Sequence, residues 1–261
     1  MAYFHIEYFS NALRRRTGFE MLIPNDIRAD IPWEKNVYAD RPMKTLFLLH
    51  GYTGKAGNWV PEELAEKYNF AIVMPTAENS FYLNGLCTGH AYQTLVGEEL
   101  VDYVRKTFRL ALTREDTFIA GLSMGGFGAL HTGLAYPDTF GKIGALSSAL
   151  IVHEIARMKP GDSNPVANYA YYRECFGDLE TVETRDCNPE VLMLKLQKNG
   201  VPLPAIYQCC GTEDFLLENN RQLHRFMTEH KIPHEYHEGP GKHDMVFWSE
   251  YIRKIVAWMF A

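Results

Sequence analysis

Short runs of mainly apolar residues recur along the chain at lengths typical of β-strands. They are continuous and do not alternate with polar residues, which predicts strands buried on both faces, as in a parallel sheet covered by helices. The segments are Thr45–Leu49, Phe70–Met74, Thr117–Ala120, Lys142–Leu146 and Ala205–Cys209.

The N-terminal segments Tyr3–Ser10 and Thr17–Ile23 do alternate between apolar and polar residues. They flank the arginines at 14–16 and predict an antiparallel hairpin. A polar loop with prolines, Pro32–Pro42, separates this hairpin from the buried strands, and a short last strand is expected at His234–His237.

Helical periodicity appears between the strands. Apolar residues recur every fourth position from Val96 to Phe108, as on one face of an amphipathic helix. Strands that alternate with helices indicate a mostly parallel sheet with helices on both faces, and the chain of residues 1–261 is expected to form a single α/β domain. The other predicted helices are Pro61–Tyr68, Met124–Tyr136, Pro189–Lys198, Glu218–His230 and Met245–Phe260.

Composition narrows the classes of function. The chain has 261 residues, of which 46% are hydrophobic and 22% charged, with a net charge of −6. This balance is typical of a globular protein and lacks the basic surface that nucleic-acid binding requires. No apolar run is long enough to span a bilayer, and the first residues do not resemble a secretion signal, so we expect a cytoplasmic protein without a nucleic-acid or membrane partner.

The cysteines predict neither disulfides nor a metal. There are 5, an odd count at scattered positions. No Cys-x-x-Cys or His-x-x-x-His spacing is present, and the adjacent Cys209 and Cys210 would point to opposite faces of a strand. We therefore expect reduced thiols and no metal site.

The motif with the clearest chemistry is Gly121-Leu122-Ser123-Met124-Gly125, which lies between a predicted strand and a predicted helix. A serine at such a tight turn is exposed at the end of the sheet, next to the free N–H groups of a helix N-terminus. The placement predicts that Ser123 is a nucleophile.

A serine nucleophile requires a histidine base and an acid that orients it. His243 lies in the loop after the last predicted strand, where its side chain can reach across the strand ends. The acid should follow the preceding parallel strand, where both Glu213 and Asp214 qualify. Asp244 is too near His243 to serve and is expected to cap the final helix.

An oxyanion site is expected where the first buried strand ends, at His50-Gly51. The backbone there can turn an N–H toward the reacting carbonyl, and the residue after the nucleophile supplies a second donor. These two donors are the backbone N–H groups of Tyr52 and Met124.

Taken together, the motifs resemble those of the esterase D branch of the α/β-hydrolases, most closely the bacterial tributyrin esterases. The similarity covers about residues 3 to 259. It implies an α/β-hydrolase fold, a Ser123, Asp214 and His243 triad, a small ester as substrate, and no cofactor or metal. Esterases of this branch often associate, so a homo-oligomer is compatible with it. The motifs are Leu-Leu-His-Gly, Asn79-Ser80-Phe81-Tyr82, Gly-Leu-Ser-Met-Gly-Gly, Cys-Gly-Thr-Glu-Asp-Phe-Leu and Gly-Lys-His-Asp.

The resemblance leaves the substrate open, because one fold hosts many activities. The branch also contains S-formylglutathione hydrolases, feruloyl and carbohydrate acetyl esterases, and acyltransferases. The acid loop here lacks the Asp-Gln-Gly opening typical of the formylglutathione enzymes, which argues against a thioester. A binding module without catalysis is disfavoured, because every chemical element of a serine hydrolase is present.

The segment between the fourth and fifth buried strands is longer than a crossover needs. A crossover requires about 10 to 12 residues and this segment has about 55, so we expect a small lid insertion at residues 149–203. It holds no long apolar helix that could line a lipid groove. Trp59, Tyr82 and Phe215, on loops at the same sheet edge, are expected to bind substrate and narrow the entrance. The sequence thus predicts a preference for acetyl to butyryl esters.

Overall fold

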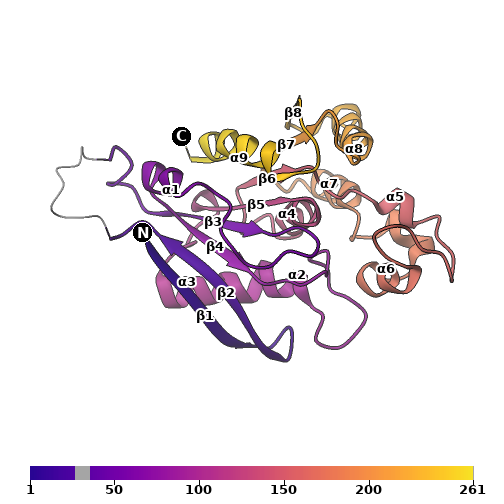
Figure 1. Cartoon of the computed structure of the whole chain (residues 1–261), viewed down its shortest axis with the longest axis horizontal. Coiled ribbons are helices and arrows are strands. Elements are labelled where there is room, and N and C mark those ends of the chain that lie inside the picture. The colour runs from indigo at the N-terminus through magenta and orange to yellow at the C-terminus, as the bar shows by residue number, and fades with distance from the viewer. Residues whose placement is uncertain (27–35, 261) are drawn as a thin grey trace.

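An eight-stranded mixed sheet forms the centre of the protein, in a computed structural model that describes residues 1–26 and 36–260 (Figure 1). The strand order is β1-β2-β4-β3-β5-β6-β7-β8. Strand β2 pairs antiparallel with β1 and β4, and all other neighbours are parallel. The bounds are β1 (Ala2–Ser10), β2 (Arg15–Ile23), β3 (Lys44–Leu49), β4 (Phe70–Pro75), β5 (Thr117–Leu122), β6 (Lys142–Leu146), β7 (Ala205–Gly211) and β8 (Glu235–Gly239).

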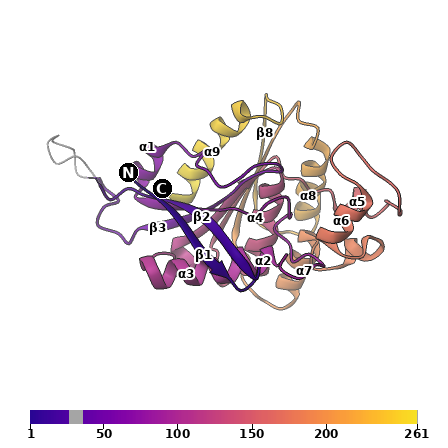
Figure 2. The ribbon, with the colours of Figure 1, turned by 60° about the horizontal axis from the view of Figure 1, so that its bottom comes forward.

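Helices cover both faces of the sheet (Figure 2). Helices α1 and α9 pack on one face, and α3, α4, α7 and α8 on the other. The sequence prediction of a mostly parallel sheet with helices on both faces and an N-terminal antiparallel hairpin is thereby confirmed. The α-helices are α1 (Glu62–Tyr68), α2 (Tyr92–Thr94), α3 (Leu100–Phe108), α4 (Met124–Ala135), α5 (Val152–Ile155), α6 (Tyr169–Phe176), α7 (Pro189–Lys198), α8 (Leu217–Glu229) and α9 (Met245–Phe260).

Strand β3 shows why the apolar runs are continuous. Leu46 and Leu48 point into the core formed with α1 and α9, while Phe47 and Leu49 point into the core on the opposite face. All of them are buried. A strand with helices on both sides has no solvent-facing position, so its sequence does not alternate.

The helix expected at residues 96–108 and the loop expected at residues 32–42 differ in how far the structure tests them. The helix expected from Val96 to Phe108 is not uniform, because residues Leu95–Glu99 form a π-helical turn before α3. A side chain at Gly97 would lie 2.1 Å from the ring of Tyr136, so the backbone approaches that ring closely there. The first part of the polar loop expected at residues 32–42 lies outside the described residues.

The connection between β6 and β7 contains more than one helix. Helix α7 packs near α4 and serves as the crossover. Helices α5 and α6 and a 3₁₀ helix, η3 (Leu179–Thr184), precede α7, and α5 and α6 extend to the right of the sheet in Figure 1.

None of the helices formed by residues 1–26 and 36–260 is both long and apolar enough to cross a bilayer.

Candidate active site

The turn between β5 and α4 forces Ser123 into an unusual backbone conformation. Its φ is 54° and its ψ is −119°, a strained region for a residue with a side chain. A Cβ at Gly121 would lie 2.2 Å from the Gly125 oxygen, and one at Gly125 would lie 2.4 Å from the Leu49 oxygen. Only glycine fits at both positions, and the resulting tight turn exposes the serine at the end of the sheet.

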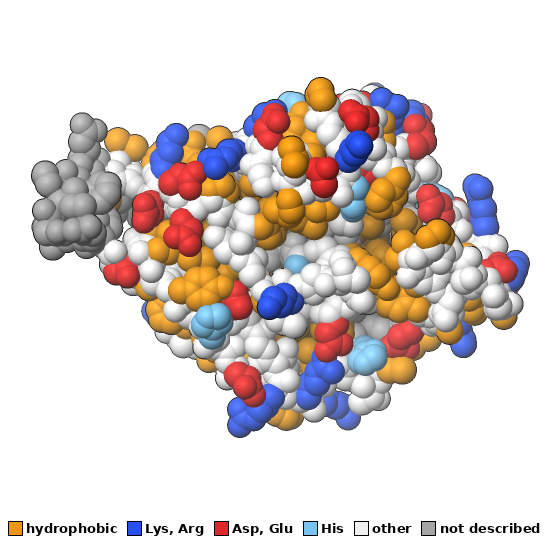
Figure 3. All heavy atoms as spheres, viewed as in Figure 1, with side chains coloured by type: hydrophobic (Ala, Val, Ile, Leu, Met, Phe, Trp, Pro, Cys, Tyr) orange, Lys and Arg blue, Asp and Glu red, His pale blue; other side chains and the backbone are white. Residues whose placement is uncertain are grey.

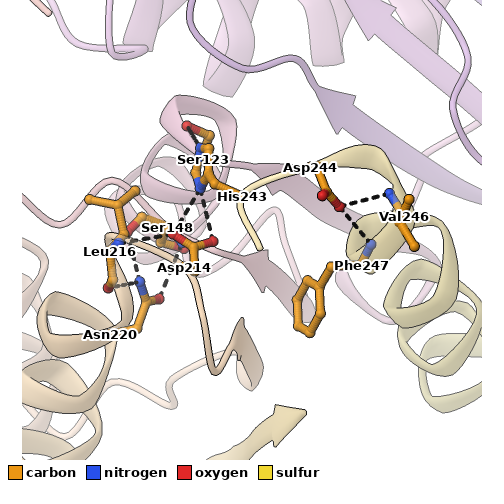
Figure 4. Close-up of polar contacts among 9 residues, drawn as sticks. All are labelled: Ser123, Ser148, Asp214, Leu216, Asn220, His243, Asp244, Val246 and Phe247. Atoms are coloured by element: carbon orange, nitrogen blue, oxygen red, sulfur yellow. Dashed lines mark hydrogen bonds and ion pairs between the residues drawn. The ribbon is translucent and has the colours of Figure 1, made fainter. Parts of the chain in front are cut away.

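Ser123, His243 and Asp214 form a continuous hydrogen-bonded chain (Figure 4). The Ser123 Oγ lies 2.9 Å from the His243 Nε2. The His243 Nδ1 lies 3.0 and 2.9 Å from the two carboxylate oxygens of Asp214. Because a carboxylate only accepts, the Nδ1–H donates to Asp214, which leaves Nε2 to accept from the serine hydroxyl. The three residues follow β5, β8 and β7, whose carboxyl ends share one edge of the sheet.

Asp214 is distinguished from Glu213 by its surroundings. Asp214 is 5% exposed and its Oδ1 accepts a bond from the Leu216 N–H at 2.8 Å, whereas Glu213 is exposed. Burial raises the pKa of Asp214, but the hydrogen bonds from His243 and Leu216 outweigh it and hold that pKa below the ordinary value. The group facing His243 is therefore a carboxylate at neutral pH.

A buried amide, Asn220 of α8, supports the acid loop (Figure 4). Its Nδ2 donates to the main-chain oxygens of Ser148 and Leu216 at 3.0 and 2.9 Å. Its Oδ1 accepts from the Ser148 N–H and the Gln208 Nε2. Asn220 thus ties the acid loop to the end of β6. The sequence analysis missed it, although a polar residue on the inward face of an amphipathic helix is a usable signal.

Asp244 caps α9 as the sequence predicts. Its Oδ1 accepts from the N–H groups of Val246 and Phe247 at 3.0 and 3.2 Å. This cap fixes the start of the helix directly after His243 (Figure 4).

The loop after β3 passes beside the serine. A Cβ at Gly51 would lie 2.7 Å from the Leu122 Cδ1 and 3.5 Å from the Ser123 Cβ. Within the described part of the chain, the N–H groups of Tyr52 and Met124 donate to no protein acceptor. Met124 is the first residue of α4, where the helix leaves its N–H groups without partners. Both groups are free to bind an oxyanion.

The buried side chain of His50 fixes the conformation of this loop. Its Nε2 accepts from the Ala77 N–H at 3.0 Å, so its Nδ1 carries the proton and donates to the Gly51 oxygen at 2.8 Å. Burial lowers the pKa of His50, so the ring is neutral. The motif histidine is therefore structural.

A cleft of about 820 Å³ opens at Ser123 and His243. Hydrophobic side chains gather around a hollow between the C-terminal elements and the α5–α6 region (Figure 3). Residues 149–203 contribute part of the wall. The lining comprises Gly51, Tyr52, Thr53, Gly54, Phe81, Leu122, Ser123, Met124, Ala149, Ile151, Glu154, Asn164, Pro165, Val166, Tyr172, Phe215, Leu216, His243 and Trp248.

Of the three residues expected at the entrance, only Phe215 is there. It is 72% exposed, and its ring centre lies 4.6 Å from that of His243. The expectation for Tyr82 is wrong, because Tyr82 is fully buried and its hydroxyl bonds to the His50 oxygen. Trp59 is also wrongly placed, since it packs against the core under α1 and α9 and does not line the cleft. Trp248 also lines the cleft, with its ring centre 4.8 Å from that of His243 in an edge-on arrangement.

Comparisons with known proteins show which family the chain belongs to. A family described as "Putative esterase" matches residues 10–259. An acetyl esterase from Caldicellulosiruptor saccharolyticus is 40% identical over 263 residues, covering 99% of this chain and 98% of that protein.

Solved structures give the same result. The fluorophosphonate-binding serine hydrolase FphF of Staphylococcus aureus, with bound substrate, is 26% identical with a TM-score of 0.84, covering 100% of this chain and 98% of its own. The S-formylglutathione hydrolase FrmB of Staphylococcus aureus is 26% identical with a TM-score of 0.81, covering 100% and 99%. The chain therefore belongs to this esterase family, has the α/β-hydrolase fold, and is a carboxylic ester hydrolase.

Proposed function

We propose that the protein is a serine carboxylesterase for short-chain acyl esters, with Ser123 as nucleophile, His243 as base and Asp214 as orienting acid. The observation that carries the proposal is the unbroken chain of hydrogen bonds from the Ser123 hydroxyl through His243 to the buried Asp214 carboxylate. This is the arrangement that converts a weak hydroxyl into a nucleophile at neutral pH.

In the first half-reaction, the His243 Nε2 takes the proton as the Ser123 Oγ attacks the ester carbonyl. The negative charge that forms on the carbonyl oxygen is stabilised by the N–H groups of Tyr52 and Met124. The intermediate then collapses. The alcohol leaves with the proton from His243, and the acyl group remains bound to Ser123.

In the second half-reaction, water replaces the alcohol. His243 removes a proton from the water, which attacks the acyl carbon through the same oxyanion site. Collapse returns the proton to Ser123 and releases the acid. Asp214 stays ionised throughout, because its hydrogen bonds lower its pKa and stabilise the charged histidine beside it. None of these proposed steps requires a cofactor.

We infer the preference for short acyl groups from the side chains that close the inner end of the cleft. Phe81 lines the cleft but is almost fully buried. Its ring packs at 4.9 Å against Phe176 and 5.7 Å against Phe127, measured between ring centres, so the core closes the space behind it. We infer that residues 149–203 act as a small lid, since Pro165, Val166 and Tyr172 of this segment line the same cleft. The 40% identical acetyl esterase supports the same preference.

Thioester hydrolysis is the second candidate, favoured by the similarity to the S-formylglutathione hydrolase. A thioester would use the same serine and the same oxyanion site. The two candidates differ in the leaving group, so they must be separated by assay.

The test is an ester panel in which the acyl chain and the leaving group vary independently. We expect kcat/KM to be highest for acetyl to butyryl esters, to fall for longer chains, and to stay unchanged when substrate forms micelles. The matched thioesters of glutathione should be poorer substrates. Rates that climb toward palmitoyl esters would contradict the acyl assignment, and a preference for the glutathione thioester would favour the second candidate.

A further inference from the structure

Three side chains with metal-binding atoms converge on the far side of α6 from the cleft. Cys87 and His90 lie on the loop between β4 and α2, and Glu174 lies on α6. One ligand atom from each residue lies within 4.8 Å of the others. None of these residues lines the cleft or takes part in the proposed mechanism.

The carboxylate of Glu174 is at the centre of this cluster. Its Oε1 lies 2.9 Å from the His90 Nδ1 and accepts from the Cys87 N–H at 2.9 Å. Its Oε2 lies 3.0 Å from the Cys87 Sγ. The Leu86 N–H also bonds to the main-chain oxygen of Glu174 at 2.9 Å.

The loop is fitted closely around the carboxylate. A Cβ at Gly85 would lie 2.8 Å from the Glu174 Oε1 and 3.1 Å from its main-chain oxygen. The glycine allows the loop to approach, and the backbone bonds hold the three side chains in place. The backbone therefore brings the three side chains together before any metal binds.

We propose that Cys87, His90 and Glu174 form a zinc-binding site. A thiolate, an imidazole nitrogen and a carboxylate oxygen are all ligands that Zn²⁺ accepts, and three protein ligands leave a fourth tetrahedral position for water. Zinc bonds of about 2.0 to 2.3 Å at tetrahedral angles place the ligand atoms roughly 3.3 to 3.6 Å apart. The Nδ1–Oε1 and Sγ–Oε2 pairs, which involve different oxygens of the carboxylate, are now 2.9 and 3.0 Å apart, and each needs to lengthen by about half an ångström to reach that spacing. All three ligand atoms already lie within 4.8 Å of one another.

Proton balance gives the site a second signature. Without a metal, the Cys87 Sγ donates its hydrogen to the Glu174 Oε2 across 3.0 Å. Zinc binds the thiolate, so the proton must leave for solvent as the metal–sulfur bond forms. His90 would bind through Nδ1, whose hydrogen now points to the Glu174 Oε1. That proton would leave for solvent while Nε2 takes one up, so the net proton released comes from the Cys87 thiol.

The site joins two parts of the structure that shape the cleft. On α6, the Tyr171 hydroxyl donates to the Asn79 oxygen at 2.6 Å. The Asn79 Oδ1 in turn accepts from the Thr53 N–H at 2.7 Å, beside Tyr52. Zinc would fasten α6 to the loop at 86–90, and Tyr172 of the same helix lines the cleft. We therefore expect zinc to raise thermal stability and to influence KM rather than kcat.

The test uses the full-length protein, freed of metal by a chelator and then titrated with Zn²⁺ by calorimetry and with Co²⁺ by absorption spectroscopy. We expect saturable binding of one metal per chain, release of a proton, and a rise in the unfolding midpoint. Co²⁺ should give the intense near-ultraviolet band of a cobalt–thiolate bond. The absence of that band in the folded wild-type protein would overturn the proposal.

Substitutions locate the site. Cys87→Ser should abolish the thiolate band. His90→Gln and Glu174→Gln should each weaken zinc binding by more than tenfold, because losing a residue that only supports a metal ligand already costs about that much affinity. His5→Gln is the matched control, because His5 is an exposed histidine beside Glu20 with no thiol nearby, and it should bind like wild type. Affinity unchanged in Glu174→Gln and Cys87→Ser would place the metal elsewhere and refute the site.

Discussion

The hydroxyl of Tyr82 donates a hydrogen bond of 2.9 Å to the main-chain oxygen of His50, and both residues are buried. The His50 ring holds the next part of the loop through Ala77 and Gly51. The proposed oxyanion donor on Tyr52 is therefore positioned by a buried polar pair that never meets the substrate.

Removing the Tyr82 hydroxyl should damage turnover more than substrate binding. Tyr82→Phe leaves the buried His50 oxygen without this partner, at a cost of about 1 to 3 kcal/mol in the free energy of unfolding. We expect kcat to fall, though by less than the roughly 10²- to 10³-fold typical of losing an oxyanion donor, with KM nearly unchanged. Steady-state kinetics and denaturant unfolding measure both effects. Tyr103→Phe, outside the site, is the control, and a large rise in KM at constant kcat would show that Tyr82 contacts substrate.

The identity of the acid can be tested with two neighbouring substitutions. Asp214→Asn removes the charge that orients His243, and we expect kcat to drop by about 10⁴-fold, as for the corresponding change in serine proteases. Glu213→Gln is the matched control on the exposed neighbour and should remain close to wild type. The reverse pattern would transfer the role to Glu213.

Acyl length should respond to the end wall of the cleft. Phe81→Ala removes the ring that closes the cleft against Phe176 and Phe127, at a cost of about 3 to 5 kcal/mol in stability. We expect hexanoyl and octanoyl esters to gain kcat/KM relative to acetyl esters. Phe215→Ala, at the exposed rim, should leave the acyl profile as it is. If Phe81→Ala keeps the wild-type profile, the acyl group binds elsewhere.

A histidine beside the cleft should make stability depend on pH. His153 of α5 lies 2.6 Å from Glu183 of η3 and 3.3 Å from Glu190 of α7. The hydrogen bond to Glu190 outweighs desolvation and, with that to Glu183, raises the pKa of His153 from 6.5 to about 9. Because the folded pKa is the higher one, the stabilisation is complete below about pH 6.5 and is lost as pH rises through about 9.

The measurement is the free energy of unfolding of wild type and His153→Gln at pH 6 and pH 10. Glu183 is 50% exposed, so screening reduces the effect, and we expect wild type to exceed the variant by about 1 to 2 kcal/mol at pH 6. The difference should shrink at pH 10. Groups that titrate equally in both proteins do not contribute to the difference in unfolding free energy between them. If that difference is the same at pH 6 and pH 10, His153 is not the source of the pH dependence.

The sequence identified the proposed triad because each member follows a strand, and parallel strands end at one edge of the sheet. Being on that edge does not specify which way a side chain points. Phe215 lines the cleft. The side chain of Tyr82, on another loop, points into the core, where its hydroxyl bonds to the His50 oxygen. Chain order alone could not separate Asp214 from Glu213, since only the folded loop shows which one is buried.

The sequence pattern could not predict which residues from distant segments contact each other. Glu174 lies 84 residues after His90, so the sequence pattern does not show that its carboxylate contacts Cys87 and His90. Asn220 supports the acid loop through bonds to Ser148, 72 residues earlier. Local periodicity carries no information about such pairings.

Labelling with a fluorophosphonate tests the assignment of Ser123 most directly, because such reagents react rapidly with a serine that a neighbouring base activates. We predict one adduct per chain, on the peptide that contains Ser123, with activity lost in proportion to labelling. Purified, folded Ser123→Ala should neither label nor turn over ester. An adduct on another residue, or substantial turnover by Ser123→Ala, would contradict the account.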